Sequence, residues 1–203
     1  TRILRPRSIA IVGASADPRS FGGFVQGNLE RFGFDGALHL VSRSSDEIGG
    51  RPCVKTIEAL PEGVDLAVLA IPEAGVLDAV ASLAARRCHA AVLFASGYAE
   101  AGPEGQARQQ ALADLARASG ILLVGPNCMG FTHLAAGVPV TFEPLAAQAR
   151  EQRPGVGVVA QSGFMAANLR DAFLARGAPV TCVFSTGNEV SVSVEDVLAH
   201  YID

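Results

Sequence analysis

The residues from Ser8 to Gly23 combine a short apolar segment with a turn of small residues, a pattern that can bind phosphate. Residues 9–12 are apolar, and Gly13, Ala14 and Ser15 follow them directly. Glycine permits a sharp turn after a buried strand, and small side chains leave backbone N–H groups open to an anion. The dinucleotide fingerprint Gly-x-Gly-x-x-Gly is not met, because it requires glycine where this chain has serine and proline. A tight turn without a ligand explains these three residues equally well.

A second candidate binding position follows the next predicted strand, residues 37–41. Enzymes that use NAD carry Asp or Glu near the end of this strand to hold the ribose hydroxyls. Residues 42–45 of this chain read Ser-Arg-Ser-Ser instead. A cation with hydroxyls suits a phosphorylated ribose, which favours NADP or coenzyme A (CoA) over NAD. Alternatively, Arg43 is an ordinary solvent-exposed residue.

The elements that position these turns alternate between strand and helix. Short apolar runs predict strands at 9–12, 37–41, 65–71, 90–95 and 121–124, and helical periodicity predicts helices at 24–31, 73–87 and 104–119. The turns after these strands read GAS, SRS, IPE, SGY and GPNCMG. Because parallel strands place their carboxyl ends at one edge of the sheet, we expect these turns to cluster there. The pattern predicts an α/β fold with a Rossmann-like parallel sheet.

The alternation weakens at residues 137–143 and resumes after a polar stretch bounded by prolines. We interpret residues 1–143 as the first domain, 144–154 as a linker and 155–203 as part of a second domain. The second part contains predicted strands at 156–160 and 180–185 and predicted helices at 164–176 and 194–202. Two strands and two helices are too few for a stable doubly wound domain, so we expect the chain to end inside it.

Composition narrows the classes of function. The chain has 203 residues, 49% of them hydrophobic, a net charge of −4 and no tryptophan, which argues against nucleic acid as a partner. Its four cysteines are scattered without a Cys-x-x-Cys pair, which fits a reducing compartment and disfavours a metal site. No apolar run reaches the length of a membrane span, and the first residues do not resemble a signal peptide. We therefore expect a soluble, cytoplasmic protein with no membrane partner.

The order of the motifs resembles one family. SIAIVGAS, VSRSSDEI, DLAVLAIP, FASGYAEAG, GPNCMG and VVAQSGFMAA follow one another as in the NDP-forming acyl-CoA synthetases, which include ADP-forming acetate–CoA ligase and the alpha subunit of succinyl-CoA synthetase. The resemblance covers essentially the whole chain, and GPNC-x-G with a downstream QSG is its specific combination. It implies a CoA-binding Rossmann-like domain followed by a flavodoxin-like domain, truncated here. The implied reaction joins an acyl acid to CoA at the expense of a nucleoside triphosphate, through an acyl phosphate and a phosphohistidine.

The resemblance also implies which residues hold the ligand. Three residues after the first strand would contact the CoA phosphates, two after the third would line the path of the adenine or pantetheine, and two later turns would lie near the thiol. A last pair would begin a helix whose N-terminus holds the phosphate of the phosphohistidine. In this order the residues are Gly13, Ala14 and Ser15; Ile71 and Pro72; Ser96, Gly97, Gly125, Pro126, Asn127 and Cys128; and Ser162 with Gly163.

The chain departs from the family pattern in two places. Family members often carry a lysine where this chain has Ser44, so Arg43 would have to replace it. The catalytic histidine of the family lies beyond Asp203, and we expect His39, His89, His133 and His200 to be structural or surface residues. The nucleotide-grasp domain, which binds ATP or ADP with Mg²⁺ in the complete enzyme, is also absent. The chain is thus expected to bind CoA without completing the reaction, as a fragment or beside another polypeptide, with a homo-oligomer as a further option.

Three other functions compete with this interpretation. Ser162, Asp196 and His200 follow the chain order of an α/β-hydrolase triad, but Phe164 is too large for the nucleophile elbow, and the last two residues share one helix turn. An NADP-dependent reductase would use Arg43 for the 2′-phosphate, although no hydride-site pair is evident. A CoA-binding module without catalysis, in which the ligand acts as a switch, agrees with all the motifs.

Overall fold

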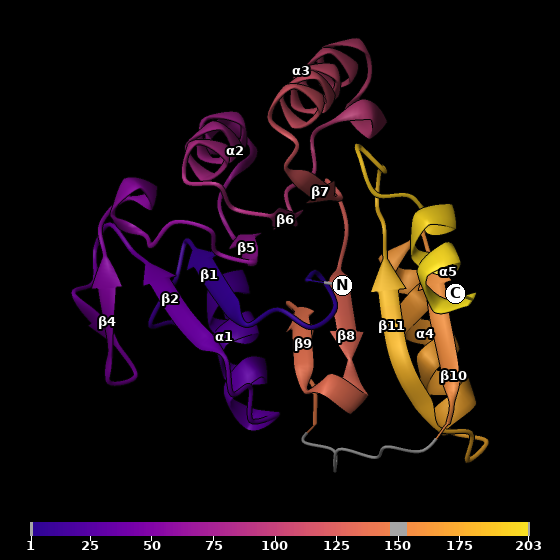
Figure 1. The fold of residues 1–203 in the computed structure, drawn as a ribbon. Helices are drawn as coiled ribbons and strands as arrows, with labels where there is room; N and C mark the ends of the chain where they lie inside the picture. Colours follow the sequence, from indigo (N-terminus) through magenta and orange to yellow (C-terminus); the bar gives the residue numbers. More distant parts are fainter. Residues whose placement is uncertain (1, 147–153, 203) are drawn as a thin grey trace.

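The structure is a computed structural model that describes residues 2–146 and 154–202. It contains two sheets (Figure 1). The strands of the larger sheet are β1 (Ser8–Val12), β2 (Ala37–Val41), β3 (Glu47–Ile48), β4 (Arg51–Val54), β5 (Leu66–Leu69), β6 (Ala90–Leu93) and β7 (Leu122–Val124). Those of the smaller sheet are β8 (Gly130–His133), β9 (Val138–Thr141), β10 (Val156–Ala160) and β11 (Val180–Ser185). The larger sheet has the order β3-β4-β2-β1-β5-β6-β7, and the smaller has the order β10-β11-β8-β9.

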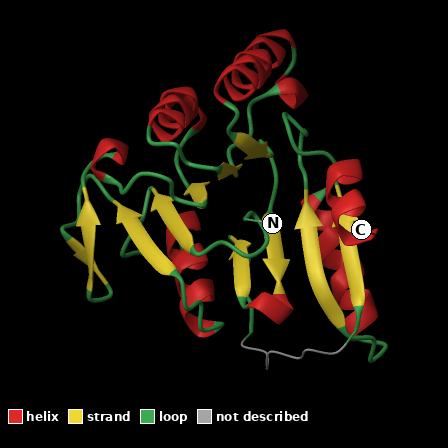
Figure 2. Ribbon diagram, in the orientation of Figure 1, coloured by secondary structure: helices red, strands yellow, loops and turns green. Residues whose placement is uncertain are grey.

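Helices cover both faces of the larger sheet. Helices α2 (Val76–Ala85) and α3 (Pro103–Ser119) lie on one face, and α1 (Phe21–Arg31) lies on the other (Figure 2). Because side chains alternate along a strand, Ile9 and Ile11 of β1 pack with α1, whereas Ala10 and Val12 join the core beneath α2 and α3. All of the pairs β1–β2, β1–β5, β5–β6 and β6–β7 are parallel. The predicted α/β fold with a parallel sheet is therefore confirmed.

Helix α1 packs between the two sheets through its buried face. One continuous hydrophobic cluster runs from Ile9 and Ile11 through Val25 and Leu29 of α1 to the smaller sheet, where it includes Phe131, Val140 and Phe184. The smaller sheet carries α4 (Gly163–Leu174) and α5 (Val194–Ile202) (Figure 1). The two sheets therefore share a core and fix each other's position.

The smaller sheet contains strands that the sequence did not reveal. Strand β8 pairs antiparallel with both β11 and β9, although both β8 and β9 precede the predicted linker. Strand β9 is an edge strand, the position in which a sheet tolerates a residue such as Pro139. The smaller sheet thus has four strands instead of the two that were predicted for its sequence. Most of the predicted linker, residues 147–153, lies outside the described residues, and the domain boundaries stay a prediction.

A buried asparagine holds the end of β9 against α1. The side-chain amide of Asn28, which is completely buried, donates to the carbonyl oxygens of Thr141 at 3.0 Å and Glu143 at 2.7 Å. Its oxygen accepts from the backbone N–H of Leu145 at 3.3 Å and from Arg31 at 2.6 Å. Asn28 therefore satisfies backbone groups at the end of β9 and in the residues just after it.

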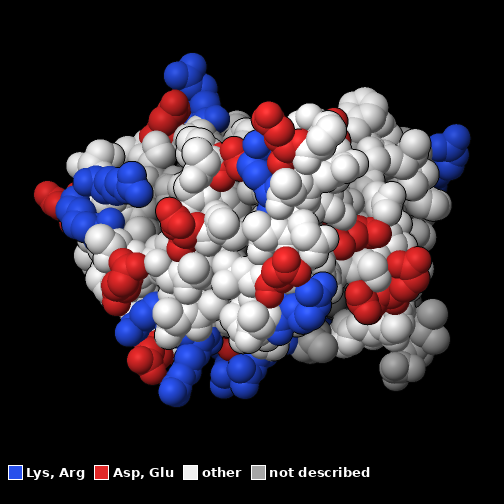
Figure 3. All heavy atoms as spheres, turned by 90° about the horizontal axis from the view of Figure 1, so that it is seen from above, with Lys and Arg blue, Asp and Glu red and all other residues white. Residues whose placement is uncertain are grey.

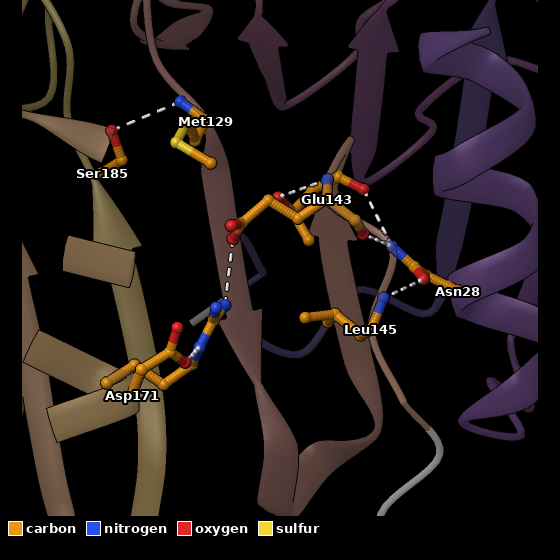
Figure 4. Close-up of polar contacts among 8 residues, drawn as sticks. Asn28, Met129, Glu143, Leu145, Asp171 and Ser185 are labelled. Atoms are coloured by element: carbon orange, nitrogen blue, oxygen red, sulfur yellow. Dashed lines mark hydrogen bonds and ion pairs between the residues drawn. The ribbon is translucent and has the colours of Figure 1, made fainter. Parts of the chain in front are cut away.

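The same segment is joined to α4 by an ion pair. Arg170 of α4 donates to the carboxylate of Glu143 at 2.9 Å and to that of Asp171 at 2.9 Å (Figure 4). The side chains of Arg170 and Glu143 are 14% and 25% exposed, so the pair is shielded from solvent better than an ordinary surface pair. Asn28, Glu143 and Arg170 together connect α1 with α4, and we call these three residues the strut.

We predict that Asn28→Ala lowers the free energy of unfolding by about 2–4 kcal/mol, because it removes the side-chain donor from the carbonyl oxygens of Thr141 and Glu143 at a fully buried position. Urea unfolding followed by circular dichroism measures this change. The control is Asn168→Ala on the exposed side of α4, which should stay within about 0.5 kcal/mol of the parent chain. Equal stabilities of the two variants would contradict the role given to Asn28.

Candidate functional site

A cleft of about 1040 Å³ lies where the carboxyl ends of both parallel strand sets meet. The larger sheet contributes the loops after β5, β6 and β7 and the first residues of α1, and the smaller sheet contributes the loops after β10 and β11. The lining residues are Arg19, Ser20, Phe21, Ala70, Ile71, Pro72, Glu73, Phe94, Ala95, Ser96, Asn127, Cys128, Met129, Phe142, Gln161, Ser162, Gly163, Phe164, Gly187 and Asn188.

The cleft lies at the point in the larger sheet where the order of successive strands reverses, on the two sides of β1. Strand β1 pairs with β2 on one side and with β5 on the other, so the loops that follow β1 and β5 lead to opposite sides of the sheet. Open α/β sheets bind their ligands in the crevice that such a divergence creates. Predicted site residues Ile71, Pro72, Ser96, Asn127, Cys128, Ser162 and Gly163 all line this one cleft.

The small-residue turn after β1 lies directly behind that lining. Gly13 has a φ of +90°, and a Cβ at this position would lie 2.4 Å from the carbonyl oxygen of Ala70. Its N–H and that of Ala14 both donate to the carbonyl oxygen of Val41, at 3.1 and 3.0 Å. The expectation that these two amides are open to an anion is therefore wrong, because the sheet already uses them. Contact of Gly13, Ala14 and Ser15 with a ligand phosphate stays a prediction.

The loop between β1 and α1 is held by side-chain caps. Ser15 accepts from the N–H of Asp17 at 3.1 Å, and Ser20 caps α1 by accepting from the N–H of Gly23 at 3.0 Å. The backbone N–H and guanidinium of Arg19 lower the pKa of the Asp17 carboxyl. Arg19 lines the cleft with an 86% exposed side chain, and sequence reasoning missed it. The signal for it in the sequence was a single arginine in the long loop between the first strand and the first helix.

The turn after β7 ties the two sheets together. The N–H of Gly125 donates to the carbonyl oxygen of Thr186 at 3.1 Å, and the carbonyl oxygen of Gly125 accepts from the N–H of Val190 at 3.0 Å. The Pro126 carbonyl accepts from the N–H of Asn188 at 2.9 Å. These bonds place Asn127 and Cys128 on the cleft wall, whereas Pro126 is buried and does not line it.

Cys128 contributes packing rather than a nucleophile. Its side chain is 3% exposed and its sulfur lies 3.4 Å from the carbonyl oxygen of Leu93. Burial raises the pKa of the Cys128 thiol to about 12, so the thiol stays protonated at neutral pH.

Helix α4 begins at the cleft. Ser162 is its N-cap and accepts from the N–H of Met165 at 3.3 Å. A Cβ at Gly163 would lie 2.2 Å from Cγ of Met129, so only glycine lets the loop after β7 approach the helix this closely. The N–H groups of the first turn have no acceptor within their own helix, which makes this end suited to an anion.

Three phenylalanine rings form one wall of the cleft. The rings of Phe21 and Phe142 are stacked with centroids 4.4 Å apart, and Phe94 meets Phe142 edge-on at 5.1 Å. Phe21 comes from α1, Phe94 follows β6 and Phe142 follows β9. Sequence reasoning missed this cluster, because its members lie far apart along the chain.

Some predicted residues lie outside the lining. Arg43 is exposed in the loop after β2, and the N–H of Gly97 donates to the carboxylate of Glu100 at 2.6 Å.

Within residues 2–146 and 154–202, none of the four histidines lines the cleft, and the described part of the chain contains no cluster of metal-ligand residues. No described helix is long and apolar enough to cross a membrane. On the face seen in Figure 3, acidic and basic side chains are interspersed.

Comparisons with known proteins agree with the fold and the cleft. Residues 7–134 match the CoA-binding domain family, and residues 153–203 match the succinyl-CoA ligase-like flavodoxin domain. A trans-feruloyl-CoA synthase from an unknown prokaryotic organism is 40% identical over 203 residues, which are 100% of this chain and 29% of that protein. The alpha subunit of the ADP-forming acetate–CoA ligase II of Pyrococcus furiosus is 27% identical over 98% of this chain and 42% of its own length.

A solved structure extends these matches to three dimensions. The dinucleotide-forming acetyl-coenzyme A synthetase 1 of Ca. Korarchaeum cryptofilum superimposes with a TM-score of 0.86 and 28% identity, over 98% of this chain and 42% of that one. The chain thus spans less than half the length of each of these three proteins. The fold, the motifs and the matches agree, and the chain belongs to the CoA-binding domain family, followed by a succinyl-CoA ligase-like flavodoxin segment as in its acid–CoA ligase relatives.

Proposed function

We propose that this chain binds CoA for an acid–CoA ligase that works through an acyl phosphate. The observation that carries the proposal is the cleft itself, in which the switch point of a parallel sheet faces the N-terminus of α4. A ligand that reaches from one to the other must be long, and CoA joins a nucleotide to a thiol through the extended pantetheine. The volume of about 1040 Å³ is at the upper end of ordinary ligand pockets.

The proposed path of CoA follows the strand ends. The phosphates lie at the loop after β1, near Ser15 and within reach of Arg19, and Arg43 approaches the ribose phosphate from the loop after β2. The pantetheine passes Ile71 and Pro72, and the thiol ends between the loop after β6 and the start of α4. Ile71 and Pro72 supply apolar contacts along this path.

The proposed chemistry divides between this chain and the rest of the enzyme. CoA supplies the sulfur nucleophile that takes the acyl group from the acyl phosphate, releasing phosphate. The amides of the first turn of α4, with Ser162 as N-cap, would stabilise the phosphate that leaves. The phosphohistidine, the nucleotide-grasp domain with its ATP or ADP and Mg²⁺, and the binding of the acid's carboxylate would come from further sequence or from another polypeptide.

Isothermal titration calorimetry of the 203-residue chain with CoA, NADP and NAD tests the proposal. We expect saturable binding of CoA and no measurable heat with either dinucleotide. An NADP-binding reductase predicts the reverse order of affinities, and its observation would refute the ligase assignment. A CoA-sensing module also predicts CoA binding, but a complete protein with no acid-dependent formation of acyl-CoA would favour it over the ligase.

We predict that Ser15→Asp weakens CoA binding about tenfold, because it introduces a negative charge beside the phosphates. The matched control is Ser15→Asn, which has the same size and also offers an oxygen to the N–H of Asp17. It should retain the affinity of the parent chain. Equal affinities of the two variants for CoA would mean that the phosphates do not lie at this loop.

We also predict that Arg43→Ala weakens CoA binding about two- to fivefold, the range of an exposed ion pair, without affecting 3′-dephospho-CoA. The comparison variant is Arg117→Ala, an exposed arginine of α3 away from the cleft, which should change neither affinity. Equal losses for both ligands in Arg43→Ala would remove this residue from the ribose phosphate.

A further inference from the structure

The cleft contains an aromatic surface that CoA binding does not require. Besides the stacked pair Phe21 and Phe142 and the edge-on ring of Phe94, it is lined by Phe164 at the start of α4. Phe94 is 5% exposed, whereas Phe21 is 47% exposed and Phe164 is 76% exposed. Rings of this size that lie open to solvent inside a cleft favour an apolar ligand that covers them.

The stack is open at one end. Phe142 covers one face of the Phe21 ring at an interplanar angle of 17°, and Phe94 meets Phe21 edge-on at 6.1 Å. The exposed surface of Phe21 therefore belongs to its opposite face and its free edges. A planar ring can continue the stack on that face, and a short aliphatic group would leave most of it uncovered.

The charged residues that line the cleft are paired with other residues and not with the phenylalanine rings. They are Arg19 and Glu73. Arg19 is paired with Asp17 at 3.4 Å in the loop before α1, and Glu73 is paired with Arg108 at 3.3 Å. Both charges are thus compensated by neighbours outside the phenylalanine cluster, and a neutral ring meets no uncompensated charge there.

From this arrangement we propose that Phe21, Phe94 and Phe142 form an acyl subsite that selects planar aromatic acyl groups, with Phe164 covering it from α4. The inference rests on the proposed function, because the acyl group must lie where the thiol of CoA meets the start of α4. The aryl ring continues the stack on Phe21, and its thioester carbonyl lies toward Ser162. The residues that define the subsite come from α1, from the loop after β6 and from the loop after β9.

The test is calorimetric titration of the 203-residue chain with CoA, acetyl-CoA, hexanoyl-CoA and cinnamoyl-CoA. Hexanoyl-CoA supplies apolar area without a planar ring, and cinnamoyl-CoA supplies both. An aromatic pair contributes about two- to tenfold in affinity beyond the buried area. We therefore expect cinnamoyl-CoA to bind about two- to tenfold more tightly than hexanoyl-CoA, and hexanoyl-CoA more tightly than acetyl-CoA.

Two variants of the exposed ring isolate its contribution. Phe21→Ala should abolish the preference for cinnamoyl-CoA and leave the affinity for CoA within about twofold of the parent chain. Phe21→Leu keeps apolar volume for packing but has no flat face, so it should fold normally and still lose the advantage of cinnamoyl-CoA over hexanoyl-CoA. The matched control is Leu77→Ala on α2, which is 42% exposed outside the cleft and should change no affinity.

Three results would overturn the inference, and they are distinguishable from one another. Equal binding of hexanoyl-CoA and cinnamoyl-CoA would leave the CoA site in place and remove the aromatic subsite. An equal loss of affinity for all four ligands in Phe21→Leu would mean that the ring packs against the nucleotide or pantetheine instead. Failure of CoA and all its thioesters to bind the parent chain would remove the proposed function itself.

Discussion

The packing of α1 between two sheets is the constraint on which the rest of the structure depends. Its residues Val25 and Leu29 belong to one hydrophobic cluster that reaches from β1 to Phe184 of β11. Because such a core is close-packed, neither sheet can shift without opening cavities against the helix. The strut of Asn28, Glu143 and Arg170 adds directional bonds to this packing and extends it to α4.

This packing explains why two separate sets of loops form one site. The carboxyl ends of the parallel strands β1, β5 and β6 and of the pair β10–β11 open toward the same cleft. Helices α1 and α4 both begin there, at Ser20 and Ser162, and both are joined further along by the strut. The capped starts of both helices therefore line a common space, as a ligand with a phosphate at one end and a reacting group at the other requires.

The sequence predicted the features that are local and left out those that depend on distant partners. Apolar runs placed Ala37–Val41, Val156–Ala160 and Val180–Ser185 with the bounds seen in the structure. Strands β8 and β9 were not predicted, because glycine and proline interrupt their apolar pattern. In addition, β11, the partner of β8, lies much later in the chain. The motif residues Ile71, Asn127 and Ser162 indicated the cleft, since each follows a strand. The aromatic wall could not be predicted, because Phe21 and Phe142 meet only after α1 packs on β9.

A crystal structure of this chain grown with CoA tests the central claim most directly, since it shows where the ligand lies relative to both sets of strand ends. We predict density for the phosphates beside the loop after β1, and density for the pantetheine past Ile71 toward the start of α4. Density for CoA at another surface, or a cleft closed by its own side chains while CoA binds in solution, would contradict the claim that the shared core of the two sheets creates the CoA site.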